Sequence, residues 1–172
     1  PHQLSGGMKQ RTIIALSLIL EPALILLDEP TTALDVITQW YILDILRTIK
    51  QKTGITMIFF THDVSIIGSV VDKLGVMYSG QLVEYGPVDK VFKKPTHGYT
   101  EALMKAIPSL YDDVSKRKAI GGYPPNLLDL PKGCRFGPRC PYAQQGLCEA
   151  EKLDWINLKE VDTNQFTLCM EW

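Results

Sequence analysis

The chain has 172 residues, of which 45% are hydrophobic and 22% charged, and its formal net charge is −1. These values are typical of folded globular domains and leave no large excess of basic residues, so we expect no nucleic-acid partner. The longest apolar region, residues 13–27, is interrupted by Ser17, Glu21 and Pro22. It therefore falls short of the roughly 20 apolar residues that a membrane-spanning helix needs, and we expect it to form protein core.

The first residues predict a short segment that can contact a phosphate, followed by a helix. Ser5, Gly6 and Gly7 can present a hydroxyl and unhindered backbone N–H groups to a phosphate. The apolar stretch 13–20 predicts a helix behind them, and the positive N-terminal end of that helix would point toward the same phosphate.

Two apolar segments predict buried parallel strands. Residues 23–27 form the first strand, which delivers Asp28 and Glu29 at its carboxyl end, where ligands bind in open parallel sheets. Residues 57–61 form the second strand, and His62 follows it. We therefore expect His62 to lie beside Glu29.

The remaining elements alternate in the manner of a layered α/β domain. Residues 36–50 predict an amphipathic helix that Gly54 ends. Its predicted apolar face consists of Val36, Ile37, Trp40, Leu43, Leu46 and Ile49. The next predicted elements are a helix at 64–71, strands at 74–78 and 81–85 joined by Ser79 and Gly80, and helices at 88–93 and 99–106. A linker-like stretch, 109–125, then leads into a tail rich in Pro, Gly and Cys.

Four motifs, in this order and spacing, resemble those of ABC transporter ATP-binding subunits of the dipeptide/oligopeptide importer type. Residues 4–8 resemble the signature motif, residues 24–29 the Walker B strand, residues 33–35 the D-loop and residues 61–63 the switch histidine. The resemblance implies an α/β fold, the C-terminal part of a P-loop NTPase domain with a helical signature region. It also implies ATP and Mg²⁺ as ligands.

The resemblance divides the chain into two parts and leaves one motif out. Residues 1–108 correspond to the C-terminal part of the nucleotide-binding domain, and residues 109–172 to a loop-rich extension with four cysteines. No G-x-x-x-x-G-K-[ST] phosphate loop occurs in these residues, and the chain starts at Pro1. We expect a fragment whose phosphate-loop half lies upstream; the alternative is a small complete protein. On its own, the chain is predicted neither to bind ATP tightly nor to hydrolyse it.

The residues at the two strand ends suit ATP hydrolysis, in which a metal bridges the phosphates and a carboxylate orients the attacking water. Asp28 suits the Mg²⁺ shell, which it contacts through water in relatives. Glu29 suits the attacking water, and His62 is placed to contact the γ-phosphate. The structural alternatives are an ordinary charged turn for the two acids and a loop histidine for His62.

The signature residues act on a different ATP molecule in relatives of this family. Two ATPase domains pair head to tail, and Ser5, Gly6 and Gly7 of one domain contact the ATP held by the other. Asp35, in the D-loop, would lie at the dimer junction. It is also placed to cap the helix that starts at Val36, and an aspartate can serve both purposes.

All four cysteines lie in the tail: Cys134, Cys140, Cys148 and Cys169, with 5, 7 and 20 residues between successive members. In a cytosolic protein four such thiols favour a metal site over disulfides. The spacing leaves an iron–sulfur cluster, zinc and free or partly buried thiols all open.

The sequence around the cysteines narrows these choices by resemblance. Residues 133–136 and 138–141 are similar to the C-terminal region of peptide-importer ATPases, in which four cysteines can ligate a [4Fe–4S] cluster. Such a cluster would be structural and would pin a tail with little regular core of its own. Similar tails often carry a histidine four residues before the last cysteine, where this chain has Gln165.

The resemblance also implies a function and a set of partners. Residues 81–86 and 95–100 resemble import-type subunits, and no sustained heptad pattern indicates the coiled coils of repair-type ABC ATPases. The expected partners are a second ATPase subunit, two membrane permeases and an extracytoplasmic solute-binding protein, with this subunit peripheral on the cytoplasmic face of the membrane. The alternatives are a non-transport ABC ATPase and a stand-alone metal-binding interaction module without catalysis.

Overall fold

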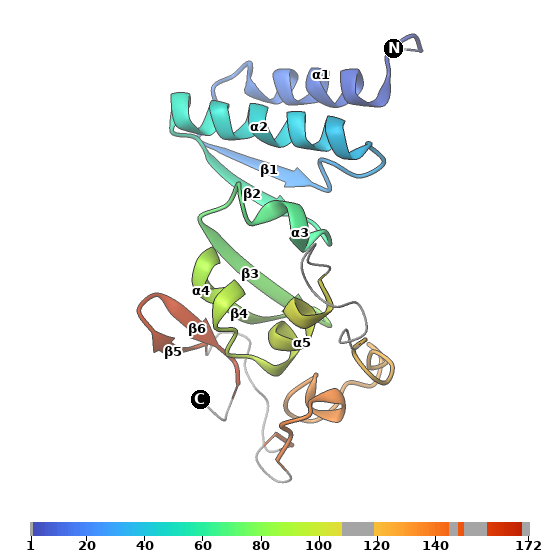
Figure 1. The fold of residues 1–172 in the computed structure, drawn as a ribbon, viewed down its shortest axis with the longest axis vertical. Helices are drawn as coiled ribbons and strands as arrows, with labels where there is room; N and C mark the ends of the chain where they lie inside the picture. The colour runs from blue at the N-terminus through green and yellow to red at the C-terminus, as the bar shows by residue number, and fades with distance from the viewer. Residues whose placement is uncertain (1, 108–118, 145–147, 150–157, 170–172) are drawn as a thin grey trace. The chain divides into compact units, whose positions relative to one another are not determined.

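The computed structural model describes residues 2–107, 119–144, 148–149 and 158–169 (Figure 1). The chain forms two compact units, Pro1–Val70 and Val71–Trp172. The predicted functional boundary between residues 108 and 109, and the linker up to residue 118, lie outside the described residues. None of the helices in the described ranges has the length and apolar character needed to cross a membrane.

The first unit consists of α1 (Gly6–Leu18), β1 (Leu24–Asp28), α2 (Val36–Thr53), β2 (Thr56–Phe60) and α3 (Val64–Ile67). Strands β1 and β2 are parallel, in register from Leu24 opposite Thr56 to Asp28 opposite Phe60. The two long helices lie on one side of this pair of strands (Figure 1). Their core is made of Ile14, Ile25, Leu27, Ile42, Leu46 and Ile55. The predicted α/β alternation of this region is therefore present.

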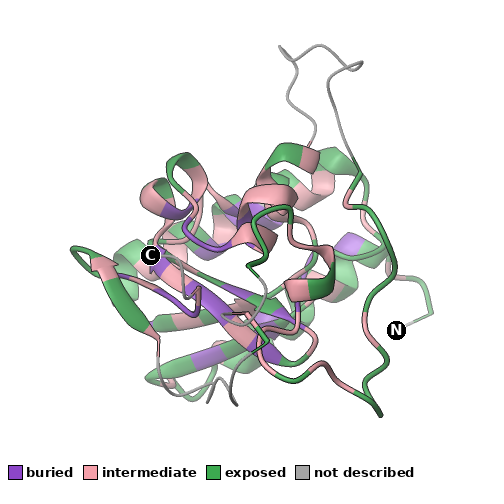
Figure 2. Cartoon of the chain, turned by 90° about the horizontal axis from the view of Figure 1, so that it is seen from below, coloured by how far each residue is buried: buried purple, intermediate pink, exposed green. Residues whose placement is uncertain are grey.

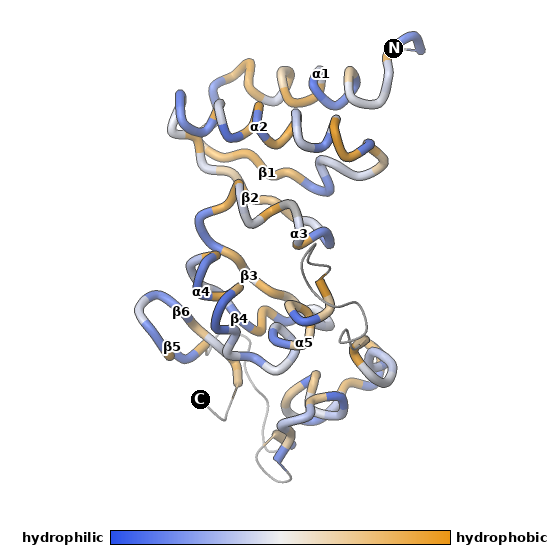
Figure 3. The backbone as a smooth tube through the Cα atoms, in the orientation of Figure 1, coloured by the Kyte–Doolittle hydropathy of each residue, from blue (hydrophilic) through white to orange (hydrophobic). Residues whose placement is uncertain are grey.

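One face of the β1–β2 pair is exposed. The hydropathy colouring shows β1 as a largely hydrophobic segment (Figure 3), yet only alternate residues of this strand are buried. On the other face Leu24, Leu26, Ile58 and Phe60 are 43–62% exposed. The prediction of fully buried strands was wrong for this chain, because no described element of the first unit covers that face. Parallel sheets are normally covered on both faces.

The apolar face of α2 differs from the predicted one at its N-terminal end. Leu43 and Leu46 are buried as predicted, and Ile42 is buried with them. By contrast, Val36 and Trp40 are 77% and 66% exposed. The helix therefore carries two apolar stripes, and only the one near its middle packs against α1 and the strands.

The second unit is built around a four-stranded antiparallel sheet in the order β3-β4-β6-β5. Its elements are β3 (Lys73–Tyr78), β4 (Gln81–Pro87), α4 (Val88–Lys93), α5 (Gly98–Ala106), η2 (Gly137–Arg139), β5 (Lys159–Asp162) and β6 (Gln165–Thr167). The hairpin turn at Ser79 and Gly80 has positive φ at both residues, 47° and 77°, as type I′ hairpin turns require. The β5–β6 hairpin was not predicted.

The tail shares the core of this sheet. Phe136, between the first two cysteines, is only 1% exposed and packs with Val76, Tyr78, Val83 and Val91. Buried residues gather on the strands and helices, whereas the loop segments are mostly exposed (Figure 2). The tail was expected to have little regular core of its own, and the structure gives it a part of the β3–β4 core and a hairpin that extends the same sheet.

Candidate functional site

Glu29 and His62 lie side by side at the carboxyl ends of β1 and β2. His62 Nδ1 is 2.7 Å from Glu29 Oε1, and Thr32 Oγ1 donates a hydrogen bond of 2.7 Å to the other carboxylate oxygen. Glu29 has a positive φ of 46°, and its backbone N–H donates to the carbonyl of Phe60, which joins the two strand ends. The expected proximity is present, whereas the roles in hydrolysis stay predictions.

The two side chains shift each other's pKa in opposite directions. The hydrogen bond from His62, followed by that from Thr32, holds the pKa of Glu29 below its ordinary value. The hydrogen bond to Glu29 and its negative charge raise the pKa of His62. Both groups are therefore charged between the lowered pKa of the acid and the raised pKa of the imidazole.

We expect Glu29→Gln to lower the pKa of His62 toward its ordinary value. The substitution removes the negative acceptor that favours the imidazolium, so the proton leaves at lower pH. An NMR titration of the His62 ring protons in both proteins measures the shift. His2 is the internal reference. An unchanged titration of His62 would contradict the pairing seen here.

Asp28 is the last residue of β1, directly opposite Phe60 of β2 and one residue before Glu29. It is exposed. Two consecutive carboxylates thus lie at the same strand end, and their roles toward Mg²⁺ and water stay predictions.

The signature residues have structural roles that the sequence did not indicate. Ser5 caps α1, since its hydroxyl accepts a hydrogen bond from the N–H of Met8 at 3.3 Å. Gly7 is buried, and a Cβ atom at this position would lie 2.6 Å from Cγ2 of Thr38 on α2. Gly6 is exposed. The close packing of α1 on α2 therefore requires glycine at position 7.

Asp35 caps α2, as the structural alternative for this residue predicted. Its two carboxylate oxygens accept hydrogen bonds from the backbone N–H of Thr38, at 2.9 Å, and from the Thr38 hydroxyl, at 2.6 Å. These bonds lower the pKa of Asp35. The predicted role at a dimer junction stays a prediction.

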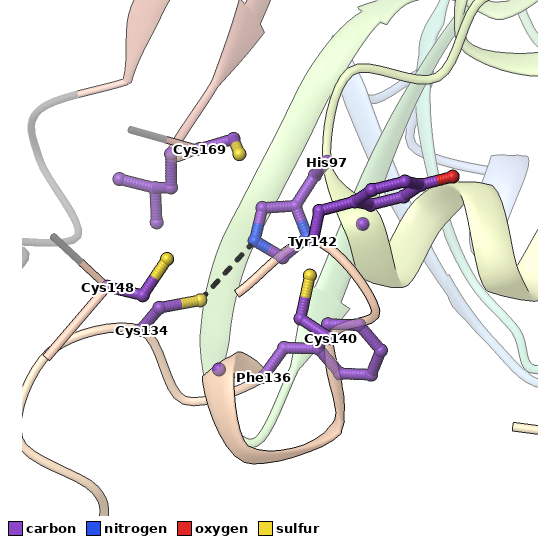
Figure 4. A pocket seen from close by; sticks show the side chains of 10 residues that line it. His97, Cys134, Phe136, Cys140, Tyr142, Cys148 and Cys169 are labelled. Atoms are coloured by element: carbon purple, nitrogen blue, oxygen red, sulfur yellow. Dashed lines mark hydrogen bonds between the residues drawn. The ribbon is translucent and has the colours of Figure 1, made fainter. Parts of the chain in front are cut away.

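All four cysteines of the tail line one small cavity in the second unit (Figure 4). None of them is in a disulfide. Burial raises the pKa of the Cys134 and Cys140 thiols. Within the described ranges no three His, Cys, Asp or Glu side chains already have the arrangement of a metal site. The four thiols thus line one cavity, but their positions do not form the coordination shell of a metal ion.

Two arginines of the cysteine segment anchor it to the rest of the unit, a role that the sequence did not predict. Arg139 donates to the Tyr78 hydroxyl at 3.0 Å and to the carbonyls of Gly121 and Ile120 at 2.7 and 3.1 Å. Arg135 donates to the carbonyl of Ser79 in the β3–β4 turn. The available signal was that Cys134 and Cys140 each have an arginine as a sequence neighbour.

Residues 97 and 98, at the start of α5, form another wall of the cavity. His97 is 3% exposed, and its Nε2 atom lies 3.9 Å from Cys134 Sγ. At Gly98 a Cβ atom would lie 2.7 Å from Cys140 Sγ, so only glycine allows this sulfur its position. From the sequence alone, this segment indicated only a family resemblance.

A buried carboxylate lies behind that wall. Glu84 on β4 has no exposed surface, and its oxygens accept hydrogen bonds from the backbone N–H groups of Thr96, at 2.9 Å, and His97, at 3.0 Å. The Thr96 hydroxyl and Gln165 Nε2 also donate to it, at 3.0 and 2.9 Å. Gln165 therefore joins β6 to β4.

Two protein families match this chain. The family described as ABC transporter matches residues 1–32, and the family described as the C-terminal region of oligopeptide/dipeptide transporters matches residues 83–148. The chain matches the ATP-binding subunits of oligopeptide/dipeptide ABC transporters. It corresponds to the C-terminal portion of such a subunit.

ATP-binding subunits of this kind from bacteria are similar over most of the chain. The dipeptide transport ATP-binding protein DppD of Caldanaerobacter subterraneus is 51% identical over 158 residues, which cover 92% of this chain and 48% of DppD. The oligopeptide transport ATP-binding protein OppD of Haemophilus influenzae is 45% identical over 91% of this chain and 49% of OppD. The chain thus spans about half the length of these relatives.

One solved structure that matches is CbiO1 from Clostridium perfringens, which is part of the ABC transporter complex CbiONQ. The match covers 54% of this chain and 37% of the CbiO1 chain, with a TM-score of 0.52 and 38% sequence identity. The predicted fold class is confirmed at this level: a mixed α/β fold that matches part of an ABC ATPase domain.

Proposed function

We propose that the protein carrying this chain hydrolyses ATP to drive an ABC importer of dipeptides or oligopeptides. The observation that supports hydrolysis most directly is the Glu29–His62 pair at two adjacent parallel strand ends. The peptide substrate is inferred from DppD and OppD, whose names give dipeptide and oligopeptide transport.

In this proposal each residue at the strand ends has its own task. Asp28 joins the Mg²⁺ shell, Glu29 orients the attacking water and His62 contacts the γ-phosphate. The lowered pKa of Glu29 makes it a weak base, which suits a group that positions water more than one that removes its proton early. The contact with His62 would hold the carboxylate in place.

The signature residues would serve a second nucleotide. Ser5, Gly6 and Gly7 would contact the ATP of a second ATPase subunit in a head-to-tail dimer, with Asp35 at the junction. The proposed assembly also contains two membrane permeases and an extracytoplasmic solute-binding protein. The subunit would be peripheral on the cytoplasmic face of the membrane.

The 172-residue chain alone is proposed to lack ATPase activity, because it has no phosphate loop to hold the β- and γ-phosphates.

A chimera tests both the inactivity of the chain alone and the proposed function of the whole subunit. The part of H. influenzae OppD that precedes the matched region is joined ahead of Pro1. We expect the chimera to hydrolyse MgATP and to restore uptake of labelled oligopeptide in cells without OppD. Saturable hydrolysis by the chain alone would overturn the first point, and hydrolysis without peptide uptake would overturn the peptide substrate.

We further propose that the four cysteines hold a [4Fe–4S] cluster. Four thiols around one cavity are a donor set that suits such a centre, whose role here would be to fix the tail. The thiols would have to lose their protons and draw together on binding. Visible absorption and analysis for iron, sulfide and zinc on protein prepared without oxygen test this. A brown protein with about four irons supports the cluster, whereas zinc or no metal would overturn it.

Gly98→Ala is expected to lower iron content severalfold, because the added methyl group would meet Cys140 Sγ at 2.7 Å. Gly121→Ala is the matched control, since a Cβ atom there has open space around it. Iron per chain, measured after identical reconstitution, compares the two variants. Equal iron in both would show that the Cys140 position seen here is not the one that binds metal.

A further inference from the structure

His97 has one feature that the proposed cluster does not explain: both of its ring nitrogens have a partner. Nδ1 accepts a hydrogen bond of 3.1 Å from the backbone N–H of Tyr99, which makes the imidazole the N-cap of α5. Nε2 lies 3.9 Å from Cys134 Sγ, the contact drawn as a dashed line in Figure 4.

The cap decides where the ring proton lies. A ring nitrogen that accepts a hydrogen bond carries no proton, so a neutral imidazole in this position must be protonated on Nε2. The cap also requires the neutral ring, because an imidazolium has no nitrogen that can accept the hydrogen bond from Tyr99. The only ring N–H is therefore the one that points toward the sulfur.

We propose that His97 is held as its Nε2–H tautomer and donates a hydrogen bond to Cys134 Sγ, which positions that sulfur and stabilises negative charge on it. The inference deepens the proposed cysteine centre, and its consequence for a loaded centre rests on that proposal. His97 would be a positioning residue, since it acts through Cys134.

Two further contacts support the placement. The backbone N–H of His97 donates to the buried Glu84 at 3.0 Å, which fixes the main chain at the cap. The His97 ring also packs against Phe136, with ring centroids 6.2 Å apart, and Phe136 belongs to the cysteine segment itself. The backbone of His97 is thus held by β4, and its ring is held by the segment that carries Cys134.

The first test uses the metal-free chain, with reduced thiols and nitrogen-15 in its histidines. NMR should show His97 protonated on Nε2 and unprotonated on Nδ1. Cys134→Ala should shift the His97 Nε2 signal while the His62 signals stay in place. A proton on Nδ1, or no response to Cys134→Ala, would overturn the inference whether or not the protein binds iron.

The second test uses the same chain after reconstitution with iron and sulfide. His97→Asn keeps a side chain that caps helices well but removes the donor to Cys134. We expect a lower midpoint potential than in the wild type, because hydrogen bonds to the ligand sulfurs favour the reduced, more negative state. An unchanged potential would overturn the charge-stabilising role. Failure of the wild type to bind iron would refute the proposed cluster, and the NMR result would still decide the hydrogen bond.

Discussion

Replacement of Glu29 by Gln in the OppD chimera is expected to reduce ATP hydrolysis by about 100-fold or more while MgATP binding stays near the wild-type level. A positioned carboxylate acting on water typically contributes at least this factor. Glutamine keeps the size of the side chain but loses the negative charge that orients the water and pairs with His62. Steady-state phosphate release measures hydrolysis, and fluorescence of a labelled nucleotide measures binding.

The matched control is Glu21→Gln, which changes an exposed acid outside the Glu29–His62 pair. The hydrolysis rate of this variant should stay within about twofold of the rate of the unsubstituted chimera, because surface substitutions rarely have larger effects. If Glu29→Gln lost no more activity than this control, the carboxylate would have no catalytic role and the charged turn considered above would be the better description. If it abolished binding as well, Glu29 would hold nucleotide and not water.

The candidate nucleotide site at the ends of β1 and β2 was predictable from the sequence, because its geometry follows from local rules. Residues that end two neighbouring parallel strands must lie at one edge, which places His62 beside Glu29 without knowledge of any other contact. Capping by Asp35 follows from its position one residue before a helix. The packing role of Gly7 was not predictable, because it depends on how closely α2 approaches α1.

For the cysteine cavity, the sequence predicted which thiols belong together but not the contacts that bring them there. The four thiols were identified, whereas the residues that bring them to one cavity come from distant segments. Arg139 contacts Tyr78, 61 residues away, and Gln165 contacts Glu84, 81 residues away. Strand β6 has only three residues, too few for a periodic pattern to reveal it.

Glu84→Gln is expected to destabilise the second unit by about 3 kcal/mol, the cost of leaving buried polar groups badly paired. Every partner of the two carboxylate oxygens is a donor. A glutamine amide must turn its NH₂ group toward at least one of them, in either orientation, at a site with no exposed surface. Hydrogen exchange of the backbone amides of β4 and β6, followed by mass spectrometry, measures how often these strands open. We expect exchange to be about 100-fold faster in the variant than in the wild type.

Glu101→Gln is the matched control, because Glu101 pairs with Lys105 at the helix surface, where such pairs contribute less than about 1 kcal/mol. Similar exchange in the two variants would mean that the Glu84 contacts add little to the fold. The expected difference has a consequence for the cavity, since one donor to Glu84 is the backbone of His97. Loosening this carboxylate should therefore also free the imidazole beside Cys134, so Glu84→Gln should broaden the His97 NMR signals even though residue 84 does not line the cavity.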